Sequence, residues 1–300
     1  MCHRFEMVSG EEADAVLDWL RAVRRALNAG GSTAATAVVP PAFGRPVDVS
    51  FDALDCYPGA ESSVIVMEGE RVEGDLVSDG EGGSFAGDRG GDLARVDLLW
   101  GVDVSWKRGL VFNARIESAL CQGRACGTEA IEDGRCIVPV RAFYETRNIE
   151  NAASVGMRAA LAEDALFGAS DLAELARGAV ADMEQDILGL KGDPTVPAPR
   201  RPRGRKPQYR FSNAGGTALL LAGLCLNDRF VLVTCEPDAV VGRVHSRMPL
   251  SLTAPEALAW LDRSTDARDL LVRHVPVSLK AQEEPAPTRR PADPDQMSLF

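Results

Sequence analysis

Hydrophobic positions near the start of the chain recur at helical spacing and predict one amphipathic helix. Ser9 and Glu12 have the spacing of a capping box, in which two side chains satisfy backbone N–H groups of the first turn. Gly30 and Gly31 end the pattern. The apolar face of this helix comprises Ala13, Val16, Leu17, Leu20, Val23 and Leu27.

The middle of the chain predicts strands. Residues 62–67 form a short apolar strand, and residues 97–145 contain three further stretches of strand and turn. In the second stretch, strand alternation places Asn113 and Arg115 on a polar face, together with Glu117. This face suits a binding site, and it also fits an ordinary half-exposed strand. The opposite face comprises Leu110, Phe112, Ala114 and Ile116.

The third stretch, residues 134–145, carries a candidate acid–base group. Pro139 cannot donate a ladder hydrogen bond, so it favours an edge strand or a bulge. Phe143 and Glu145 are two positions apart and therefore point to the same side. Burial beside aromatic rings would raise the pKa of the Glu145 carboxyl, whereas an exposed glutamate at this position would carry no special chemistry.

The last part of the pattern predicts a hairpin and a second capped helix. Two apolar strands, residues 217–226 and 229–234, flank a two-residue turn. Thr253 and Glu256 have the capping-box spacing, with a proline between them. His245 lies in a turn-like segment before this helix, where it is either a structural histidine or part of a site.

Three segments interrupt or follow these elements. Residues 70–91 are rich in Gly and acidic side chains and predict a surface loop. Residues 147–205 predict a helical insertion with a basic linker, and residues 283–300 a disordered tail. The Pro/Arg-rich residues 197–210 fit either a contact with a phosphate backbone or a solvated linker that balances the acidic helices.

The composition favours a soluble globular chain. The 300 residues are 45% hydrophobic and 26% charged, which is enough for one large domain or two small ones. The longest apolar run, residues 218–226, is too short to cross a bilayer, and the first residues lack a signal-peptide pattern. We therefore expect a cytoplasmic monomer with reduced thiols and no membrane partner.

The net charge and the numbers of cysteines and histidines limit the kinds of binding site that the chain can form. The formal net charge of −11 disfavours a generally basic nucleic-acid binder, but a local basic groove would still bind a phosphate backbone. Seven cysteines without a C-x-x-C pair and only three histidines argue against zinc. We expect neither a metal nor a cofactor.

Cys2 introduces a specific chemistry. Removal of Met1 would leave a first residue that carries an α-amine and a thiol on one Cα. Their reference pKa values, about 7.7–8.0 and about 8.5, leave part of each group reactive near neutral pH. The amine can form an imine with an aldehyde, and the thiol can then close a thiazolidine ring. The simpler alternative is that position 2 carries no chemistry.

Taken together, these pieces resemble the SRAP family, the SOS response-associated peptidase-like proteins that crosslink to abasic sites in single-stranded DNA. The resemblance covers most of the chain, in the family's order, and omits the Gly-rich loop, the insertion and the tail. The matching segments are Met1-Cys2 with Arg4, Trp100-Gly101, Trp106, residues 113–115 with Glu117, 135–139 with 143–145, 222–224, 245–249 and 260–261.

The resemblance implies a single α+β domain, residues 1–282, built on a curved, barrel-like β-structure. It implies that Cys2 forms a thiazolidine with the ring-opened aldehyde of an abasic deoxyribose. Glu145 would assist ring opening and proton transfer, while Asn113 and His245 would position and protonate the sugar. The candidate DNA contacts are Arg4, Trp106, Arg115 and Arg247.

Some positions depart from the family pattern. His3 stands where the family usually has glycine, and Thr146 replaces an aromatic residue. Ala53 and Asp55 align with an Arg and an Asn that contact DNA in the family, which predicts altered DNA contacts. We hypothesise that the arginines of residues 200–210 compensate.

The last residues resemble the short peptide by which bacterial repair and replication proteins bind the sliding clamp. In such peptides, a glutamine and the final Leu-Phe fill a pocket of the clamp. The corresponding residues are Gln296, Leu299 and Phe300.

Two other classes of function stay open on the sequence. In an N-terminal cysteine amidohydrolase or self-processing peptidase, the Cys2 thiolate would attack an acyl carbon, with the α-amine as base. In a non-enzymatic adaptor, the chain would bind single-stranded DNA or the clamp without chemistry.

Overall fold

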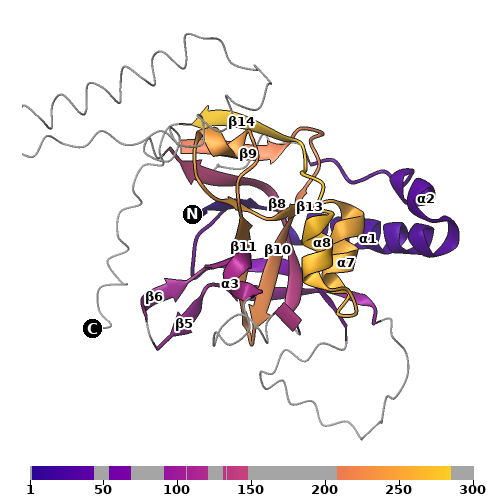
Figure 1. Ribbon diagram of the computed structural model, residues 1–300, viewed down its shortest axis with the longest axis horizontal. Helices are drawn as coiled ribbons and strands as arrows, with labels where there is room; N and C mark the ends of the chain where they lie inside the picture. Colours follow the sequence, from indigo (N-terminus) through magenta and orange to yellow (C-terminus); the bar gives the residue numbers. More distant parts are fainter. Residues whose placement is uncertain are drawn as a thin grey trace, which may run out of the picture.

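The computed structural model describes residues 2–43, 54–68, 91–105, 107–120, 131–132, 134–147 and 208–284 (Figure 1). The loop 70–91, except residue 91, and the insertion 147–205, except residue 147, lie outside these residues. The predicted tail 283–300 also lies outside them, except residues 283 and 284, which form the end of a strand instead of disordered chain. The helices are α1 (Gly10–Gly30), α2 (Ser32–Thr36), α3 (Ile116–Ala119), α7 (Ala254–Leu261), α8 (Ala267–Val272) and the 3-10 helix η2 (Val241–Arg243). The strands are β1 (Phe5–Met7), β2 (Asp55–Cys56), β3 (Glu61–Met67), β4 (Leu93–Trp100), β5 (Val102–Val104), β6 (Lys107–Val111), β7 (Asn113–Arg115), β8 (Arg135–Thr146), β9 (Gln208–Asn213), β10 (Leu219–Leu226), β11 (Arg229–Cys235), β12 (Met248–Pro249), β13 (Ser251–Leu252) and β14 (Leu279–Glu284).

Five strands close into a barrel, in the order β8–β10–β11–β4–β3 and back to β8. Every contact in this ring is antiparallel except β11 with β4, which is parallel. The fold is therefore α+β around a barrel-like β-structure, which confirms the predicted fold class. Figure 1 shows β10 and β11 side by side at its centre.

Side chains alternate between two hydrophobic clusters along the barrel strands. Leu219 and Leu221 of β10 belong to the cluster that also contains Cys2, while Leu220 and Ala222 belong to the other. The second cluster also contains the apolar faces of α1 and α7, so it lies between the barrel and its helices. A strand alternates its side chains with a period of two, so the first cluster is the barrel interior.

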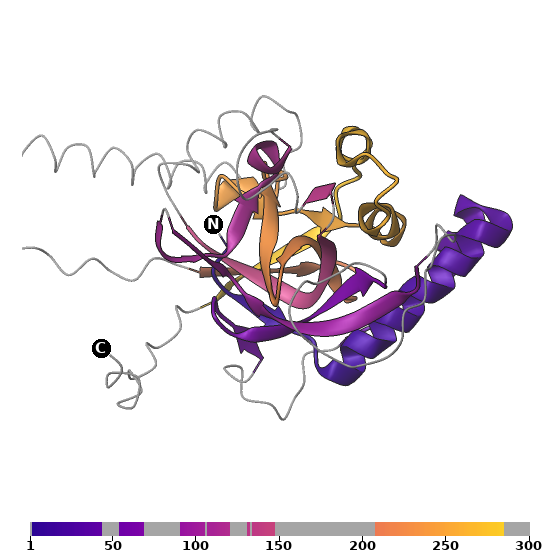
Figure 2. The ribbon, with the colours of Figure 1, turned by 90° about the horizontal axis from the view of Figure 1, so that it is seen from below.

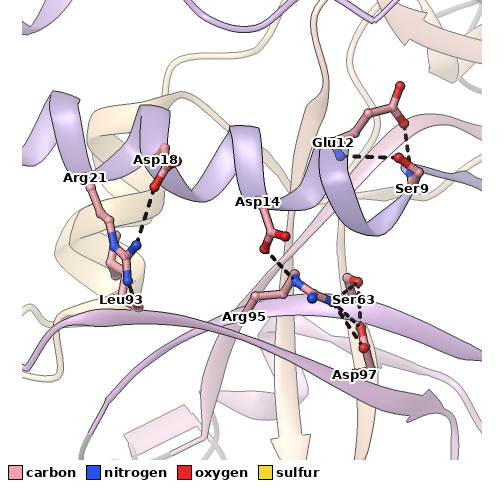
Figure 3. A network of polar contacts seen from close by, with 9 residues as sticks. All are labelled: Ser9, Glu12, Asp14, Asp18, Arg21, Ser63, Leu93, Arg95 and Asp97. Carbon is pink, nitrogen blue, oxygen red and sulfur yellow. Dashed lines mark hydrogen bonds and ion pairs between the residues drawn. The ribbon is translucent and has the colours of Figure 1, made fainter.

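Helix α1 lies across the outside of β3 and β4 (Figure 2). Polar contacts reinforce this packing (Figure 3): Arg95 Nε donates to Asp14 Oδ1 at 2.7 Å, and Arg21 Nη2 donates to the Leu93 carbonyl at 2.6 Å. On the strands, Arg95 also reaches Asp97 at 3.1 Å. Charged residues therefore border the apolar face of the helix and fix its position on the sheet.

The local sequence signals are confirmed. Helix α1 begins after Ser9 with both bonds of the capping box, and Glu256 accepts a hydrogen bond from Thr253 N at 2.9 Å before α7. The hairpin β10–β11 turns at Asn227, whose φ of 58° is the left-handed conformation expected of such a turn. No helix among the described residues combines the length and apolar character needed to span a bilayer.

The strand predicted to contain residues 110–117 differs from the structure in two places. The strand expected to continue to Glu117 ends at Arg115, and Ile116 begins helix α3. It is also broken at Phe112, whose carbonyl accepts hydrogen bonds from Leu232 N and Trp100 Nε1. The chain leaves its hairpin partner β5 here and pairs with β11 instead.

Of the two alternatives predicted from Pro139, an edge strand or a bulge, the edge strand is wrong. Strand β8 is central, because it pairs with β10, β3, β1 and β9. Pro139 lies where one side of β8 changes its partner from β3 at Ile137 to β1 at Val140, and this break accommodates a residue without an N–H. The register of β8 with β1 also shifts between Glu6 and Met7. This irregularity, close to Pro139, fits the bulge that is the other alternative.

Candidate functional site

Strand β1 holds the N-terminal segment at one end of the barrel. Phe5 pairs with Phe143 of β8 on one side and with Cys56 of β2 on the other. Tyr144 N donates to the Arg4 carbonyl at 3.0 Å. Cys2, three residues before Phe5, is thereby brought to the C-terminal half of β8.

Two buried ion pairs reinforce this placement. Arg4 Nη2 lies 2.8 Å from Asp55 Oδ2, and both side chains are at most 5% exposed. Arg4 Nη1 also donates to Gln208 Oε1 at 2.7 Å, and its guanidinium lies 3.9 Å from the centre of the Tyr144 ring. Glu6 Oε2 lies 2.7 Å from Arg210 Nη2 of β9. Charges buried without partners would be costly, so these pairs fix the strand in register.

Cys2 is completely buried. Its Sγ donates a weak hydrogen bond to the Arg4 carbonyl at 3.4 Å, and its own carbonyl accepts one from Asn113 Nδ2 at 2.7 Å. Burial, followed by the nearby Glu145 carboxylate, raises the pKa of the Cys2 thiol far above its ordinary value. The thiol is therefore neutral at physiological pH.

Glu145 occupies the end of β8 and is 1% exposed. Burial raises the pKa of its carboxyl to about 8, while the positive amino terminus acts in the opposite direction. A carboxyl group with this pKa can donate and accept a proton near neutral pH. Glu145 is therefore not the exposed glutamate of the alternative interpretation.

His245 lies after η2 and faces Glu145, with 3.8 Å between Nδ1 and Glu145 Oε2. Nδ1 is also 3.1 Å from Arg247 N and 3.0 Å from the Arg247 carbonyl oxygen. Burial lowers the pKa of His245, and the amino terminus and His3 lower it further. The His245 ring is therefore predominantly neutral at pH 7.

The predicted DNA-contact arginines differ in their surroundings. Arg115 is exposed at the end of β7. Arg247 forms a two-pronged ion pair with Glu117, and Arg4 is buried in its pair with Asp55. A phosphate contact by Arg4 would require this pair to open.

The fold gathers Cys2, Asn113, Glu145 and His245 from four separated segments. They come from the segment before β1, from strands β7 and β8, and from the turn after η2. Several predicted site residues lie outside the described residues, namely Trp106, Gln296, Leu299 and Phe300. The same holds for Arg200 to Lys206 of the basic linker. Arg210 is described and forms an ion pair with Glu6.

Sequence reasoning missed the partners of the site. The sequence identifies Asp55 only as a departure from a family pattern, whereas the structure gives it a role as the counter-ion of Arg4. No sequence pattern indicates Glu6 or Gln208. Only their spatial neighbours explain these polar residues, since no local spacing links Arg4 with residues 55 or 208.

The described residues contain no group of three or more His, Cys, Asp or Glu side chains that could hold a metal ion. A hollow of about 260 Å³ lies between β5 and the β10–β11 turn, where Asp103, Asp228 and Arg229 line it. None of the four gathered residues lines this hollow.

No protein-family model matches the chain, and no curated protein matches it. Among solved structures it is similar to a phage-related protein from Bordetella bronchiseptica, with 18% identity over 96% of this chain and 95% of that one and a TM-score of 0.49. A second protein from the same organism is 16% identical over 95% of this chain and 100% of that one, with a TM-score of 0.46. A protein from Bacteroides thetaiotaomicron is 15% identical over 63% of this chain and 68% of that one, with a TM-score of 0.38.

Proposed function

We propose that the protein traps abasic sites in single-stranded DNA by a covalent thiazolidine at Cys2, as proteins of the SRAP family do. The proposal requires removal of Met1, so that the α-amine belongs to Cys2. The observation that carries it is the burial of Cys2 near Glu145, which His245 faces in turn, with Asn113 bonded to the Cys2 carbonyl. The resemblance of the sequence to the SRAP motifs supports it independently.

The reaction is a condensation. The α-amine of Cys2 adds to the aldehyde carbon of the ring-opened abasic sugar and gives a carbinolamine. Loss of its hydroxyl group with one proton, as water, leaves an imine. The thiol adds to the imine carbon, its proton passes to the nitrogen, and the ring closes. One water is released in total, and no oxidant or reductant is consumed.

In these reaction steps, Glu145 acts as both the acid and the base. With a pKa of about 8, it is largely protonated at pH 7 and can donate its proton to the sugar ring oxygen as the ring opens. The carboxylate that results can accept a proton from the attacking amine, and the re-formed carboxyl can then donate that proton to the departing hydroxyl. His245, whose Nδ1 faces Glu145, would position the sugar hydroxyls.

Arg115 is the strongest candidate for a phosphate contact, because its side chain is exposed two residues after Asn113 on the same strand. This position, close to the residue that binds the Cys2 carbonyl, would place a phosphate near the reacting sugar. The contacts of Trp106, Arg4 and Arg247 with DNA stay predictions. An abasic nucleotide lacks base stacking, so its entry into the site costs little.

The neutral thiol weighs against the amidohydrolase alternative. A hydrolase that begins with thiolate attack needs a lowered cysteine pKa, whereas burial and Glu145 raise the pKa of Cys2. In the thiazolidine route the amine attacks first, and the thiol adds only to an activated imine. The proposed order of steps therefore suits the surroundings of Cys2 better.

The first test is incubation of the purified protein with single-stranded DNA that contains one abasic site. We expect an adduct that survives denaturation and runs as a shifted band. Cys2→Ala should form none, and Glu145→Gln should form it at least about a hundredfold more slowly. A native protein that binds this DNA without forming an adduct would support the adaptor alternative and refute the proposal.

We further propose that Gln296, Leu299 and Phe300 bind the bacterial sliding clamp. A peptide of the last residues should bind the purified clamp, and Leu299→Ala with Phe300→Ala should abolish this binding while adduct formation stays unchanged. A peptide that shows no binding would contradict the proposal.

A further inference from the structure

Glu117 and Arg247 form a two-pronged ion pair beside the site. Arg247 Nη1 lies 2.7 Å from Glu117 Oε1, and Arg247 Nη2 lies 2.9 Å from Glu117 Oε2. The same Nη2 donates to the Thr234 carbonyl at 2.6 Å. Both terminal nitrogens of the guanidinium are thus engaged, and the Arg247 side chain is only 13% exposed. A forked guanidinium held in this way has little freedom to turn toward another anion.

The backbone of Arg247 contacts the His245 ring. Nδ1 of His245 lies 3.1 Å from the Arg247 N–H nitrogen and 3.0 Å from the Arg247 carbonyl oxygen. An unprotonated Nδ1 can accept from this N–H, and a protonated Nδ1 can donate to this oxygen. Arg247 therefore offers a partner to His245 in either state, provided that its backbone stays in place.

Glu117 of this ion pair lies in the same chain segment as Asn113, which contacts Cys2. Asn113 of β7 binds the Cys2 carbonyl at 2.7 Å, and Thr234 Oγ1 of β11 donates to the Ala114 carbonyl at 3.3 Å. Glu117 follows in helix α3, four residues after Asn113. One short stretch of chain thus contacts the proposed nucleophile at one end and Arg247 at the other.

We propose that Glu117 is a positioning residue, which acts through Arg247 to hold the His245 ring in place against Glu145. This inference rests on the proposed function, because it concerns the geometry of the same site. It assigns Arg247 to the support of His245 in place of a direct phosphate contact. Glu117 contacts neither the proposed nucleophile nor its acid–base partner in the described contacts.

A positioning role and a phosphate-contact role predict different effects of the variants Glu117→Gln and Arg247→Gln. If Arg247 bound a phosphate, Glu117 would compete with that phosphate, so Glu117→Gln would strengthen DNA binding and Arg247→Gln would weaken it. If the pair positions His245, both variants lose the same support. Each should then slow adduct formation at saturating DNA by about ten- to a hundredfold, with the half-saturating DNA concentration unchanged within about twofold.

The kinetic experiment compares Glu117→Gln, Arg247→Gln and the double variant with the native protein. Because the two residues act as a unit, the double variant should be no slower than the slower single variant. Glu236→Gln is the matched control, since it removes an exposed carboxylate one residue after β11 and should leave the rate unchanged. Opposite shifts in half-saturation with unchanged maximal rates would overturn the proposal.

A second readout does not depend on DNA. The chain has three histidines, so ¹⁵N spectra of histidine-labelled protein can resolve His245, with His245→Asn as the assignment variant. The charged groups that face this ring are Glu145, His3, the amino terminus and Arg247 itself. Loss of Glu117 should alter the His245 ring signals and lower its pKa, because the carbonyl partner of protonated Nδ1 is no longer held.

The two readouts separate the two proposals. If the native protein forms no adduct but Glu117→Gln still changes the His245 signals, the proposed function fails and the structural coupling stands. If adducts form normally in both single variants and the His245 signals are unchanged, the positioning role is wrong and the proposed function is unaffected. Unchanged signals in Glu117→Gln, combined with a folded spectrum, would by themselves contradict the coupling.

Discussion

Burial gives Glu145 the properties of an acid–base group, and it also has a cost for stability. The carboxyl has a pKa of about 8 in the native protein, compared with an ordinary value of 4.5. Between these two pH values the native state holds a proton that the unfolded state has released. The contribution of this group is therefore fully present below pH about 4.5 and is lost as the pH rises through about 8.

This linkage gives a prediction for Glu145→Gln. Glutamine keeps the shape of the side chain but does not ionise, so the variant avoids the cost of a buried carboxylate. We expect its free energy of unfolding, relative to that of the native protein, to rise by roughly 1–3 kcal/mol between pH 5 and pH 8.5. Urea unfolding at the two pH values measures this difference.

Glu236→Gln supplies the control, because an exposed carboxylate should show no such dependence on pH. An equal stability difference for Glu145→Gln at both pH values would show that Glu145 has an ordinary pKa. Its role as an acid near neutral pH would then be untenable.

At the scale of elements, β1 is a three-residue strand whose position depends on polar contacts as well as on its ladder. Arg4 and Glu6 flank Phe5, and their ion pairs reach β2 and β9 respectively. Phe5 itself packs against Trp100, with 4.7 Å between ring centroids. Because Cys2 lies just before this strand, the position of β1 determines where Cys2 lies relative to Glu145. The stability of β1 therefore affects the geometry of the site.

We predict that Asp55→Ala destabilises the protein by about 3–5 kcal/mol, because it leaves the Arg4 guanidinium buried without its counter-ion. Arg4→Met combined with Asp55→Ala should cost less than Asp55→Ala alone, since the uncompensated charge is then gone. Denaturant titrations of the native protein and these two variants measure the differences.

The matched control is Asp103→Ala. Asp103 is 77% exposed and 4.0 Å from Arg229, so its loss should cost less than about 1 kcal/mol. If Asp55→Ala were as mild as Asp103→Ala, the buried pair would not anchor β1.

Local signals in the sequence predicted local structure, but not the partners of distant residues. The caps at Ser9 and Thr253 and the turn at Asn227 depend on neighbours a few residues away, so their patterns identify them. The end of the strand at Arg115 depends on β11, a long-range partner, and alternation alone predicted a longer strand. Asp55 likewise acquires its role only when β2 pairs with β1.

At the scale of the whole molecule, barrel closure creates the candidate site. The parallel contact between β11 and β4 and the antiparallel contacts of β8 with β3 and β10 join segments far apart in the chain. The sequence indicated Cys2, Asn113, Glu145 and His245 through a family resemblance. The closed barrel and its added strand β1 give these residues their mutual contacts and the burial of Cys2 and Glu145.

The central claim is that Cys2 is the first residue of the active protein and forms a ring with an abasic aldehyde. Mass spectrometry of the adduct tests this most directly. After exposure to single-stranded DNA with one abasic site, the intact mass should equal that of the protein without Met1 plus the DNA, minus one water. Without any reducing agent, digestion should place the sugar on the peptide of residues 2–4. A retained Met1, or a sugar attached at any other residue, would contradict the account.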